Sequence, residues 1–140
     1  MAALSPFHLA IPVNDLDKAR EFYTKVLKCE EGRSTEAWAD LNFFGHQVVL
    51  HRNPLHKGHS FASIVDGHSV PIPHFGLVLT WEEWEQMADE LKKAGVTFVV
   101  EPYIRFKDKK GEQGTMFFLD PSGNALEFKA FKDPAKLFAK

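Results

Sequence analysis

Hydrophobic and polar residues alternate along this chain in a pattern that occurs twice. The first occurrence begins with the apolar segment 7–13, which is followed by an amphipathic helix that starts near Asp15. The second begins at residues 73–80 and continues into another amphipathic helix at residues 82–94. Alternation over a short run predicts a strand, and apolar residues three and four apart predict a helix. Each half of the chain is therefore predicted to fold as a strand, a helix and further strands.

Shorter apolar runs complete each half of this pattern. The first helix is predicted over residues 15–28, and strands should follow at 30–34, 37–44 and 47–52. In the second half, Gly95 should end the helix, and the strands are predicted at 97–106, 115–119 and 125–131. Residues 133–140 should form a short terminal helix or fray. The longest irregular segment is then a loop over residues 53–70, rich in Gly, His and Ser, and a loop of this length in a compact domain is typical of lids and binding loops.

The two halves are too short to form separate domains. Neither half can bury its own sheet face, whereas 140 residues that are 44% hydrophobic can form one compact core. We therefore expect an α+β fold and a single domain over residues 1–140. It should consist of module 1 (about 5–53) and module 2 (about 71–131), joined by a loop (about 54–70).

Three polar residues take equivalent places in the repeat and point to a metal site. His8 and His74 each stand seven residues before a predicted helix, and Glu127 aligns with Val49 when the glycines before the final strands are matched. The large apolar residues of these strands should face the helices, so the alternation directs His8, His74 and Glu127 to the opposite face. Two imidazoles and a carboxylate on one face form a ligand set that leaves positions open on a divalent metal. A metal site of this type is the leading hypothesis.

Charge and composition narrow the classes of partner. The formal net charge is −2, with both signs interspersed, so no basic surface for nucleic acid is expected. No apolar stretch approaches the length that spans a membrane, and no signal peptide is recognisable at the start of the chain. The single cysteine, Cys29, cannot form an intramolecular disulfide. These features predict a cytoplasmic protein whose partner is a small molecule.

The residues around the proposed ligands resemble the vicinal oxygen chelate superfamily, which includes glyoxalase I, bleomycin-resistance proteins, fosfomycin-resistance enzymes and extradiol dioxygenases. The resemblance rests on His8 with the following segment 14–27 (NDLDKAREFYTKVL), on His74, and on residues 118–124 (FLDPSGN) before Glu127. It implies two βαβββ modules that form a half-open barrel around a metal held by His8, His74 and Glu127. It also implies a homodimer.

Departures from the family's patterns favour one chemistry over the others. Glyoxalase I enzymes typically have a glutamate ligand at the position of Val49, and fosfomycin-resistance transferases have a threonine at the position of Ala10. The resemblance therefore favours a dioxygenase-like oxidoreductase that acts on a small substrate with vicinal oxygens, such as a catechol, chelated to Fe(II) or Mn(II), with Zn or Ni as the other metals to consider. A glyoxalase-type isomerase or thiol transferase, and a non-catalytic small-molecule binding protein, remain the alternatives.

Four further residues are candidates for the site. His51 lies two residues beyond Val49 and should share its face, so it is the candidate catalytic acid or base, although an ordinary histidine at a strand end fits as well. Tyr103, Arg105 and Phe117 are the candidates for substrate binding, because aromatic walls and a positive charge suit a planar or anionic ligand. Whether Phe117 or its neighbour Phe118 faces the helices stays open at this point.

Overall fold

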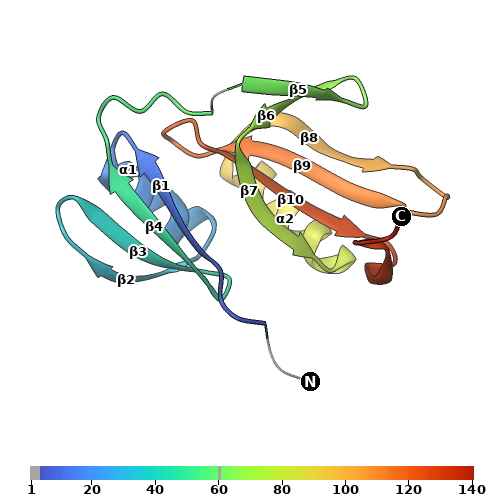
Figure 1. Ribbon diagram of the computed structural model, residues 1–140, viewed down its shortest axis with the longest axis horizontal. Helices are drawn as coiled ribbons and strands as arrows, with labels where there is room; N and C mark the ends of the chain where they lie inside the picture. Colours follow the sequence, from blue (N-terminus) through green and yellow to red (C-terminus); the bar gives the residue numbers. More distant parts are fainter. Residues whose placement is uncertain (1–3, 60) are drawn as a thin grey trace. The chain divides into compact units, whose positions relative to one another are not determined.

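The computed structural model describes residues 4–59 and 61–140, and within them the chain forms two compact units with a boundary between Lys57 and Gly58. Each unit contains a four-stranded sheet with a helix against it (Figure 1). Residues 8–52 of the first unit and residues 74–131 of the second each follow the order strand, helix and three strands. The predicted α+β class and the two βαβββ modules are therefore confirmed.

The first unit has the strand order β1-β4-β3-β2. Its elements are β1 (His8–Val13), α1 (Leu16–Glu21), a π-helical turn (Phe22–Val26), β2 (Glu30–Ser34), β3 (Trp38–Phe43) and β4 (His46–Arg52). The first and last strands of the module, β1 and β4, pair in parallel with β1 at the edge of the sheet, while β4 pairs antiparallel with β3.

One helix covers one face of this sheet. The Asp15 side chain accepts a hydrogen bond from the backbone N–H of Lys18 and so caps α1, as expected for a helix that starts near Asp15. The helical segment then continues as a π-helical turn rather than as the single α-helix predicted over 15–28. Buried residues from both parts of the helix and from the strands form the core, among them Leu16, Ala19, Tyr23, Ile11, Val13, Leu41 and Leu50.

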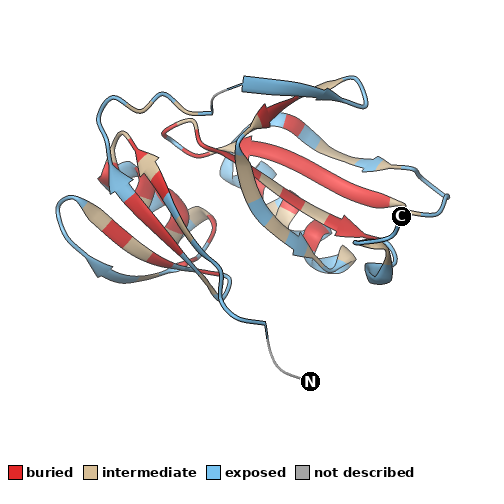
Figure 2. Cartoon of the chain, viewed as in Figure 1, coloured by how far each residue is buried: buried red, intermediate tan, exposed pale blue. Residues whose placement is uncertain are grey.

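The second unit repeats this arrangement with the order β7-β10-β9-β8. Its sheet and helix are β7 (His74–Leu79), α2 (Trp81–Ala94), β8 (Thr97–Arg105), β9 (Gln113–Leu119) and β10 (Ala125–Phe131), and a 3-10 turn follows at Pro134–Lys136. Here β7 and β10 pair in parallel, and β9 lies between β10 and β8 with both pairings antiparallel. Figure 2 shows β9 buried along nearly its whole length.

Local chemistry fixes both ends of α2. Thr80 accepts a hydrogen bond from the Glu83 N–H, and the Glu83 carboxylate accepts one from the Thr80 N–H, which forms a capping box. Gly95 ends the helix at φ 74°, as predicted from the sequence, because glycine adopts the left-handed conformation without steric cost. The indole of Trp84 donates a hydrogen bond of 2.9 Å to the carbonyl of Phe128, which ties the helix to β10.

The predicted loop over residues 54–70 is partly wrong, because it contains a β-hairpin. Strands β5 (Phe61–Val65) and β6 (His68–Ile72) pair antiparallel and are joined by Asp66 and Gly67, which have φ values of 50° and 76°. Two positive φ values in a two-residue turn match the right-handed twist of the strands, and Asp-Gly is one of the sequences that favour such a turn. The Asp-Gly pair between two apolar runs is the sequence signal for this hairpin. The content of Gly, His and Ser in the same segment favoured a loop instead.

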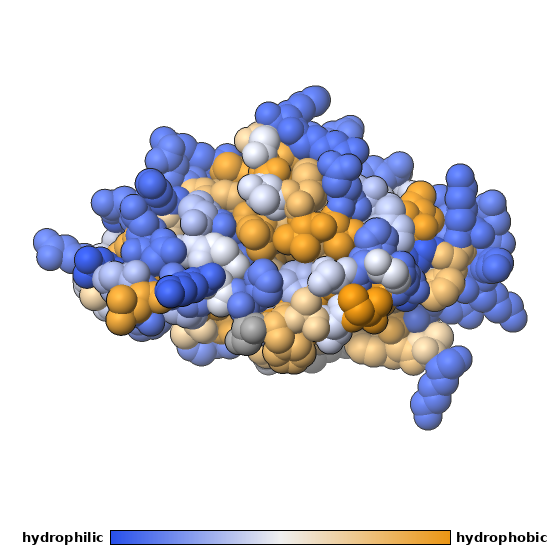
Figure 3. Space-filling view, turned by 90° about the horizontal axis from the view of Figure 1, so that it is seen from above, coloured by the Kyte–Doolittle hydropathy of each residue, from blue (hydrophilic) through white to orange (hydrophobic). Residues whose placement is uncertain are grey.

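Strand β5 is exposed along its whole length, including the side chains of Phe61 and Ile64. In Figure 3, which views the molecule from the side on which β5 lies in Figure 1, hydrophobic surface is surrounded by hydrophilic side chains. Strand β6 is the inner strand of the hairpin, with Val70 and Pro71 buried. No helix in the described part of the chain is both long enough and apolar enough to cross a membrane.

Candidate functional site: a histidine–carboxylate pair in the second unit

The central feature of the second unit is a contact between His74 and Glu127. Strands β7 and β10 place Ala125 beside His74 and Glu127 beside Gly76, so the histidine and the carboxylate are diagonal neighbours on adjacent strands. The Nε2 atom of His74 lies 3.2 Å from Oε1 of Glu127. Leu126 and Phe128 on either side of Glu127 are fully buried on the helix side, which directs the carboxylate to the opposite face, as the alternation predicted.

The imidazole of His74 is held by its second nitrogen. Its Nδ1 lies 2.7 Å from the carbonyl oxygen of Pro71, and a carbonyl can only accept, so Nδ1 carries the proton. The hydrogen bond to Glu127 is the main reason why the pKa of His74 is raised, ahead of the opposing effect of burial. Nε2 therefore points at the carboxylate, and a metal ion could take the place of the proton between them. A backbone carbonyl behind the ring is the usual way in which metal-ligating histidines are oriented.

The carboxylate of Glu127 is also held from behind. Its Oε2 accepts a hydrogen bond of 2.5 Å from the Thr115 hydroxyl, and the Nζ of Lys129 lies 3.9 Å from the same oxygen. Burial alone would raise the pKa of Glu127, but the hydrogen bonds from His74 and Thr115 hold it below its ordinary value. The carboxylate is therefore ionised and oriented, which leaves Oε1 directed at His74.

A cavity of about 180 Å³ opens beside this pair, within the second unit. Its sheet side is lined by His74, Thr115, Phe117, Glu127 and Lys129, and the β8 side by Val100, Tyr103 and Arg105. The hairpin closes a further side with Val65, His68 and Val70. The volume is below the range typical of pockets for drug-sized ligands, so the cavity suits a small molecule.

Apolar packing holds the hairpin against the sheet. Val70 of β6, Val100 of β8 and Phe117 of β9 form a small buried cluster, and Tyr103 packs against it. The ring of His68 stacks at 4.7 Å on Tyr103, and Phe117 meets the ring of His74 edge-on at 5.0 Å. Phe117 therefore faces the cavity, while Phe118 packs with Phe98 and Phe128 on the helix side.

At one edge of the cavity an ion pair joins the hairpin turn to β8. Asp66 accepts a hydrogen bond from Nε of Arg105. Burial first, and then the charge of Asp66, raise the pKa of Tyr103 above its ordinary value. The positive charge of Arg105 is thus matched by a carboxylate of the same chain, and the phenol of Tyr103 stays protonated at neutral pH.

The structure brings together five of the seven residues predicted for the site: His74, Glu127, Tyr103, Arg105 and Phe117 all line this cavity. The other two, His8 and His51, belong to the first unit. His8 is exposed on β1, with its Nδ1 2.7 Å from the amide oxygen of Gln47, so its Nε2 carries the lone pair. His51 is exposed on β4, paired with Trp38 of β3 and Pro12 of β1.

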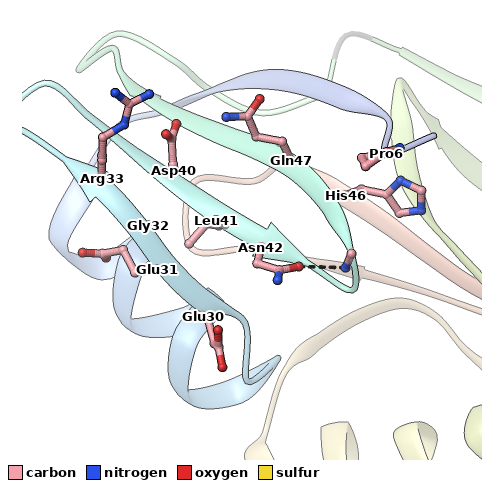
Figure 4. A pocket seen from close by; sticks show the side chains of 11 residues that line it. Pro6, Glu30, Glu31, Gly32, Arg33, Asp40, Leu41, Asn42, His46 and Gln47 are labelled. Atoms are coloured by element: carbon pink, nitrogen blue, oxygen red, sulfur yellow. Dashed lines mark hydrogen bonds between the residues drawn. The ribbon is translucent and has the colours of Figure 1, made fainter.

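The first unit has a groove of its own, with a volume of about 480 Å³. It is lined mainly by polar residues of β2, β3 and β4, including Arg33, Asp40, Asn42 and Gln47 (Figure 4). The Asn42 side chain accepts a hydrogen bond of 2.8 Å from the Gly45 N–H and so orders the β3–β4 turn. Neither His8 nor His51 lines the groove, and it therefore adds nothing to the predicted site.

The list of candidates drawn from the sequence lacked Thr115 and His68, which line the cavity, and Asp66, which binds the cavity residue Arg105. Thr115, His68 and Asp66 act through contacts with residues 12 to 39 positions away, which no periodicity encodes. The loop predicted over residues 53–70 includes His68, so the sequence pattern gave no reason to place this residue against β8. The Asp-Gly turn was the one available signal, since a hairpin at this place carries both Asp66 and His68 to β8.

The donor atoms of the pair suit a divalent metal. Imidazole nitrogen and carboxylate oxygen are ligands shared by Fe, Mn, Zn and Ni sites, and both His74 and Glu127 have the supporting hydrogen bonds that such ligands require. Among the residues that the structure describes, no three His, Cys, Asp or Glu side chains lie close enough together to hold a metal ion. The second unit thus supplies two of the three predicted ligands.

Paired βαβββ modules with a histidine–carboxylate pair on the sheet face of the second module define a class of small-molecule-binding α+β protein. A family model described as "Glyoxalase/Bleomycin resistance protein/Dioxygenase superfamily" matches residues 5–128. This match covers most of the chain, and the protein belongs to that superfamily, as the sequence motifs predicted.

Individual relatives agree with this assignment. The chain is 26% identical over 132 residues to a glutathione transferase FosA of Serratia marcescens, covering 94% of this chain and 84% of that protein. A glyoxalase/bleomycin resistance protein/dioxygenase from Alicyclobacillus acidocaldarius is 32% identical, with a TM-score of 0.77 and 96% of both chains covered. The fosfomycin resistance protein FosX of Listeria monocytogenes shares the fold at 18% identity, with a TM-score of 0.68 and 93% of both chains covered.

Proposed function

We propose that this protein is a metal-dependent enzyme acting on a small substrate whose neighbouring oxygen atoms bind the metal. The observation that supports this best is the His74–Glu127 pair, because both side chains are oriented from behind and both open onto a cavity. A pair whose role was purely structural would not need an adjoining cavity. The relationship to a glutathione transferase, which is an enzyme, supports catalysis over simple binding.

The ligands in this proposal are Nε2 of His74 and Oε1 of Glu127, and the sequence motifs add His8 as the third. Fe(II) or Mn(II) is the metal favoured by a set of two imidazoles and one carboxylate, while Zn and Ni accept the same donors. When bound, the metal would polarise the substrate oxygens and stabilise negative charge that develops on them. Thr115 keeps the carboxylate in place, and the Pro71 carbonyl keeps the imidazole in the required tautomer.

The reaction that we propose first is the transfer of a thiol, such as glutathione, to a small electrophile. The glutathione transferase FosA, which aligns with 94% of the chain, supports this choice. In the cavity, the Tyr103 phenol is protonated at neutral pH and can donate to an oxygen that becomes negatively charged. Fosfomycin is a suitable first compound to test, because the structural relative FosX is a fosfomycin resistance protein.

The dioxygenase reaction inferred from the sequence is the second candidate. The apolar cluster of Val70, Val100 and Phe117 beside the histidine–carboxylate pair favours it, since a planar aromatic substrate would pack against such a wall. The superfamily includes dioxygenases, whereas its relative FosA of Serratia marcescens is a glutathione transferase. The two reactions consume different co-substrates, which makes them easy to separate.

Metal binding is the first experiment. Equilibrium dialysis with Mn(II), Fe(II), Zn(II) and Ni(II), followed by elemental analysis, should give one ion per chain in the unmodified protein. The His74→Ala and Glu127→Gln variants should each lose it, whereas His59→Ala, which alters an exposed histidine outside the cavity, should retain it. His8→Ala tests the third ligand separately. Stoichiometric metal in both His74→Ala and Glu127→Gln would exclude the proposed site.

The reaction is then tested on the metal-loaded protein. Loss of free thiol in the presence of fosfomycin and other small electrophiles would identify a transferase, and oxygen uptake with catechols would identify a dioxygenase. Both activities should disappear in Glu127→Gln if they belong to this site. Light scattering in the same buffer tests the homodimer that the resemblance implies, which we retain as part of the proposal.

A further inference from the structure

Lys129 occupies a central place in the cavity of the second unit. On β10 it lies directly opposite Thr115 of β9, and Thr115 in turn lies opposite Tyr103 of β8. Three polar side chains therefore form one row across three neighbouring strands, next to the row that carries Glu127 and Phe117. All five line the cavity. The short side chain of Thr115 leaves space between the ammonium group on one side and the phenol on the other.

Lys129 also differs from Arg105 in its charge balance. Arg105 forms an ion pair with Asp66. Among the described residues, the one carboxylate within 4.0 Å of the Lys129 Nζ atom is that of Glu127, at 3.9 Å. That carboxylate already accepts hydrogen bonds from Thr115 and faces His74. If Glu127 ligates a metal, its negative charge is directed to the metal, and the ammonium of Lys129 is left as a positive charge at the cavity wall.

The distance between Glu127 and Lys129 limits the length of the ligand. Glu127 and Lys129 are two residues apart on one strand, which separates their backbone positions by about 6.5 Å. A molecule that reaches both must be short, and the cavity of about 180 Å³ holds roughly the volume of six water molecules. The apolar wall of Val70, Val100 and Phe117 lies on the hairpin side of the same space.

We propose that Lys129 is a specificity-determining residue that binds an anionic group of the substrate, with Tyr103 as a second donor across Thr115. The substrate class is then a small molecule with a metal-chelating pair of oxygens at one end and a carboxylate, phosphonate or sulfonate a few bonds away. This inference rests on the proposed function, because the chelating end is placed at His74 and Glu127. Arg105, the other cation that lines the cavity, instead holds the hairpin through Asp66.

Two hydroxamates that share a chelating group test this assignment. Acetohydroxamate is neutral beyond its chelating oxygens, and N-hydroxysuccinamic acid adds a carboxylate two methylene groups away. Calorimetric titration of the Mn(II)-loaded protein should give about tenfold tighter binding for the carboxylate-bearing compound, because a hydrogen bond to a charged group is worth at least that factor. Lys129→Met should reduce this tenfold ratio between the two compounds to about one, whatever its affinity for acetohydroxamate itself.

The control is Lys132→Met, since Lys132 lies over the Trp81 ring at 4.5 Å and does not line the cavity. It should keep the tenfold preference. If acetohydroxamate binds but the carboxylate adds no affinity, or if Lys129→Met retains the preference, the role of Lys129 is excluded while the metal site stands. If Mn(II) or acetohydroxamate does not bind, or binds equally to His74→Ala, the proposed function itself fails and this inference fails with it.

Discussion

The hydroxyl of Thr115 donates a hydrogen bond of 2.5 Å to Oε2 of Glu127, from the neighbouring strand and two positions from Phe117, the direct partner of Glu127. The two oxygens of this carboxylate consequently have different partners, since Oε1 faces Nε2 of His74 at 3.2 Å. One oxygen serves to hold the group still, and the other is available to a ligand. This division of roles within one side chain leads to the first prediction.

Thr115→Val keeps the shape of the side chain but removes the hydrogen bond. The pKa of Glu127 should rise, and the affinity for a divalent metal should fall on the order of tenfold, as is typical when a supporting hydrogen bond to a ligand is lost. Competition with a fluorescent chelator measures this affinity. Thr97→Val, on the exposed end of β8, is the matched control and should have no effect. Equal affinities of both variants would contradict a supporting role for Thr115.

Gly76→Ala should destabilise the protein severely. A methyl group at this position would lie 1.6 Å from the backbone oxygen of Glu127, so β7 and β10 would have to move apart. We expect a loss of about 3 kcal/mol or more in the free energy of unfolding, measured by urea titration. Gly32→Ala is the control, because its added methyl would meet the Asp40 Cβ at an ordinary 3.4 Å. A stable Gly76→Ala variant would show that the β7–β10 ladder is looser than described.

Asp66→Asn removes the charge at the hairpin turn and keeps a residue that tolerates positive φ. Without the ion pair to Arg105, amide hydrogens of β5 and β6 should exchange faster, while those of α2 should exchange at the unmodified rate. Mass-spectrometric hydrogen exchange provides the comparison. Asp108→Asn is the matched control, since Asp108 also has a positive φ but forms no ion pair with a described residue. Unchanged exchange in the hairpin would mean that apolar packing alone holds it.

The ion pair between Arg20 and Glu31 in the first unit should make the free energy of unfolding depend on pH in the acid range. Hydrogen bonding to Arg20 lowers the pKa of Glu31 below its ordinary value of 4.5. A carboxylate with a lowered folded pKa contributes stability that is fully present above the unfolded pKa and is lost as the pH falls through the folded pKa. Both side chains are partly exposed, so the contribution should be only about 0.5 kcal/mol.

Urea titrations of Arg20→Gln between neutral and acid pH test this prediction. The variant should be less stable than the unmodified protein at neutral pH, and the difference should shrink below the unfolded pKa of Glu31. Arg33→Gln changes an exposed arginine on β2 and should show no such pH dependence. A difference that stays constant with pH would indicate that Arg20 acts through packing.

Cys29 should be unreactive in the folded protein. Burial raises the pKa of its thiol to about 12, and the side chain is buried. Because the thiolate is the reactive form, iodoacetamide at pH 8 should label the native chain far more slowly than the chain in urea. Intact-mass measurement over time follows both reactions. Similar rates would show that the region between the π-helical turn and β2 opens readily.

Strand alternation predicted the direction of the site residues well. Leu126 and Phe128 are fully buried on the helix side, which leaves Glu127 on the cavity face. The same rule could not decide between Phe117 and Phe118, because it needs a fixed point in the strand and residues 116–119 of β9 are all apolar. The pairing of Phe117 with Glu127 in the sheet supplied that point, and it comes from tertiary structure.

Contacts between distant residues were beyond the reach of the sequence pattern. Nothing local in the chain indicates that Arg105 binds Asp66 or that Thr115 supports Glu127. The hairpin was missed for a different reason. Polar residues and glycines in the segment before residue 61 outweighed the Asp-Gly turn, and that turn alone distinguishes a hairpin from a loop.

The two strands of the β5–β6 hairpin have different surroundings. Its inner strand contributes Val70 and His68 to the cavity, while its outer strand adds Val65 at the end and leaves every residue exposed. Substitutions in this dozen residues can therefore reshape the space above the histidine–carboxylate pair without disturbing the helix-packed core. Over evolutionary time, such a segment lets one scaffold acquire new ligand preferences while its fold and its histidine–carboxylate pair are inherited unchanged.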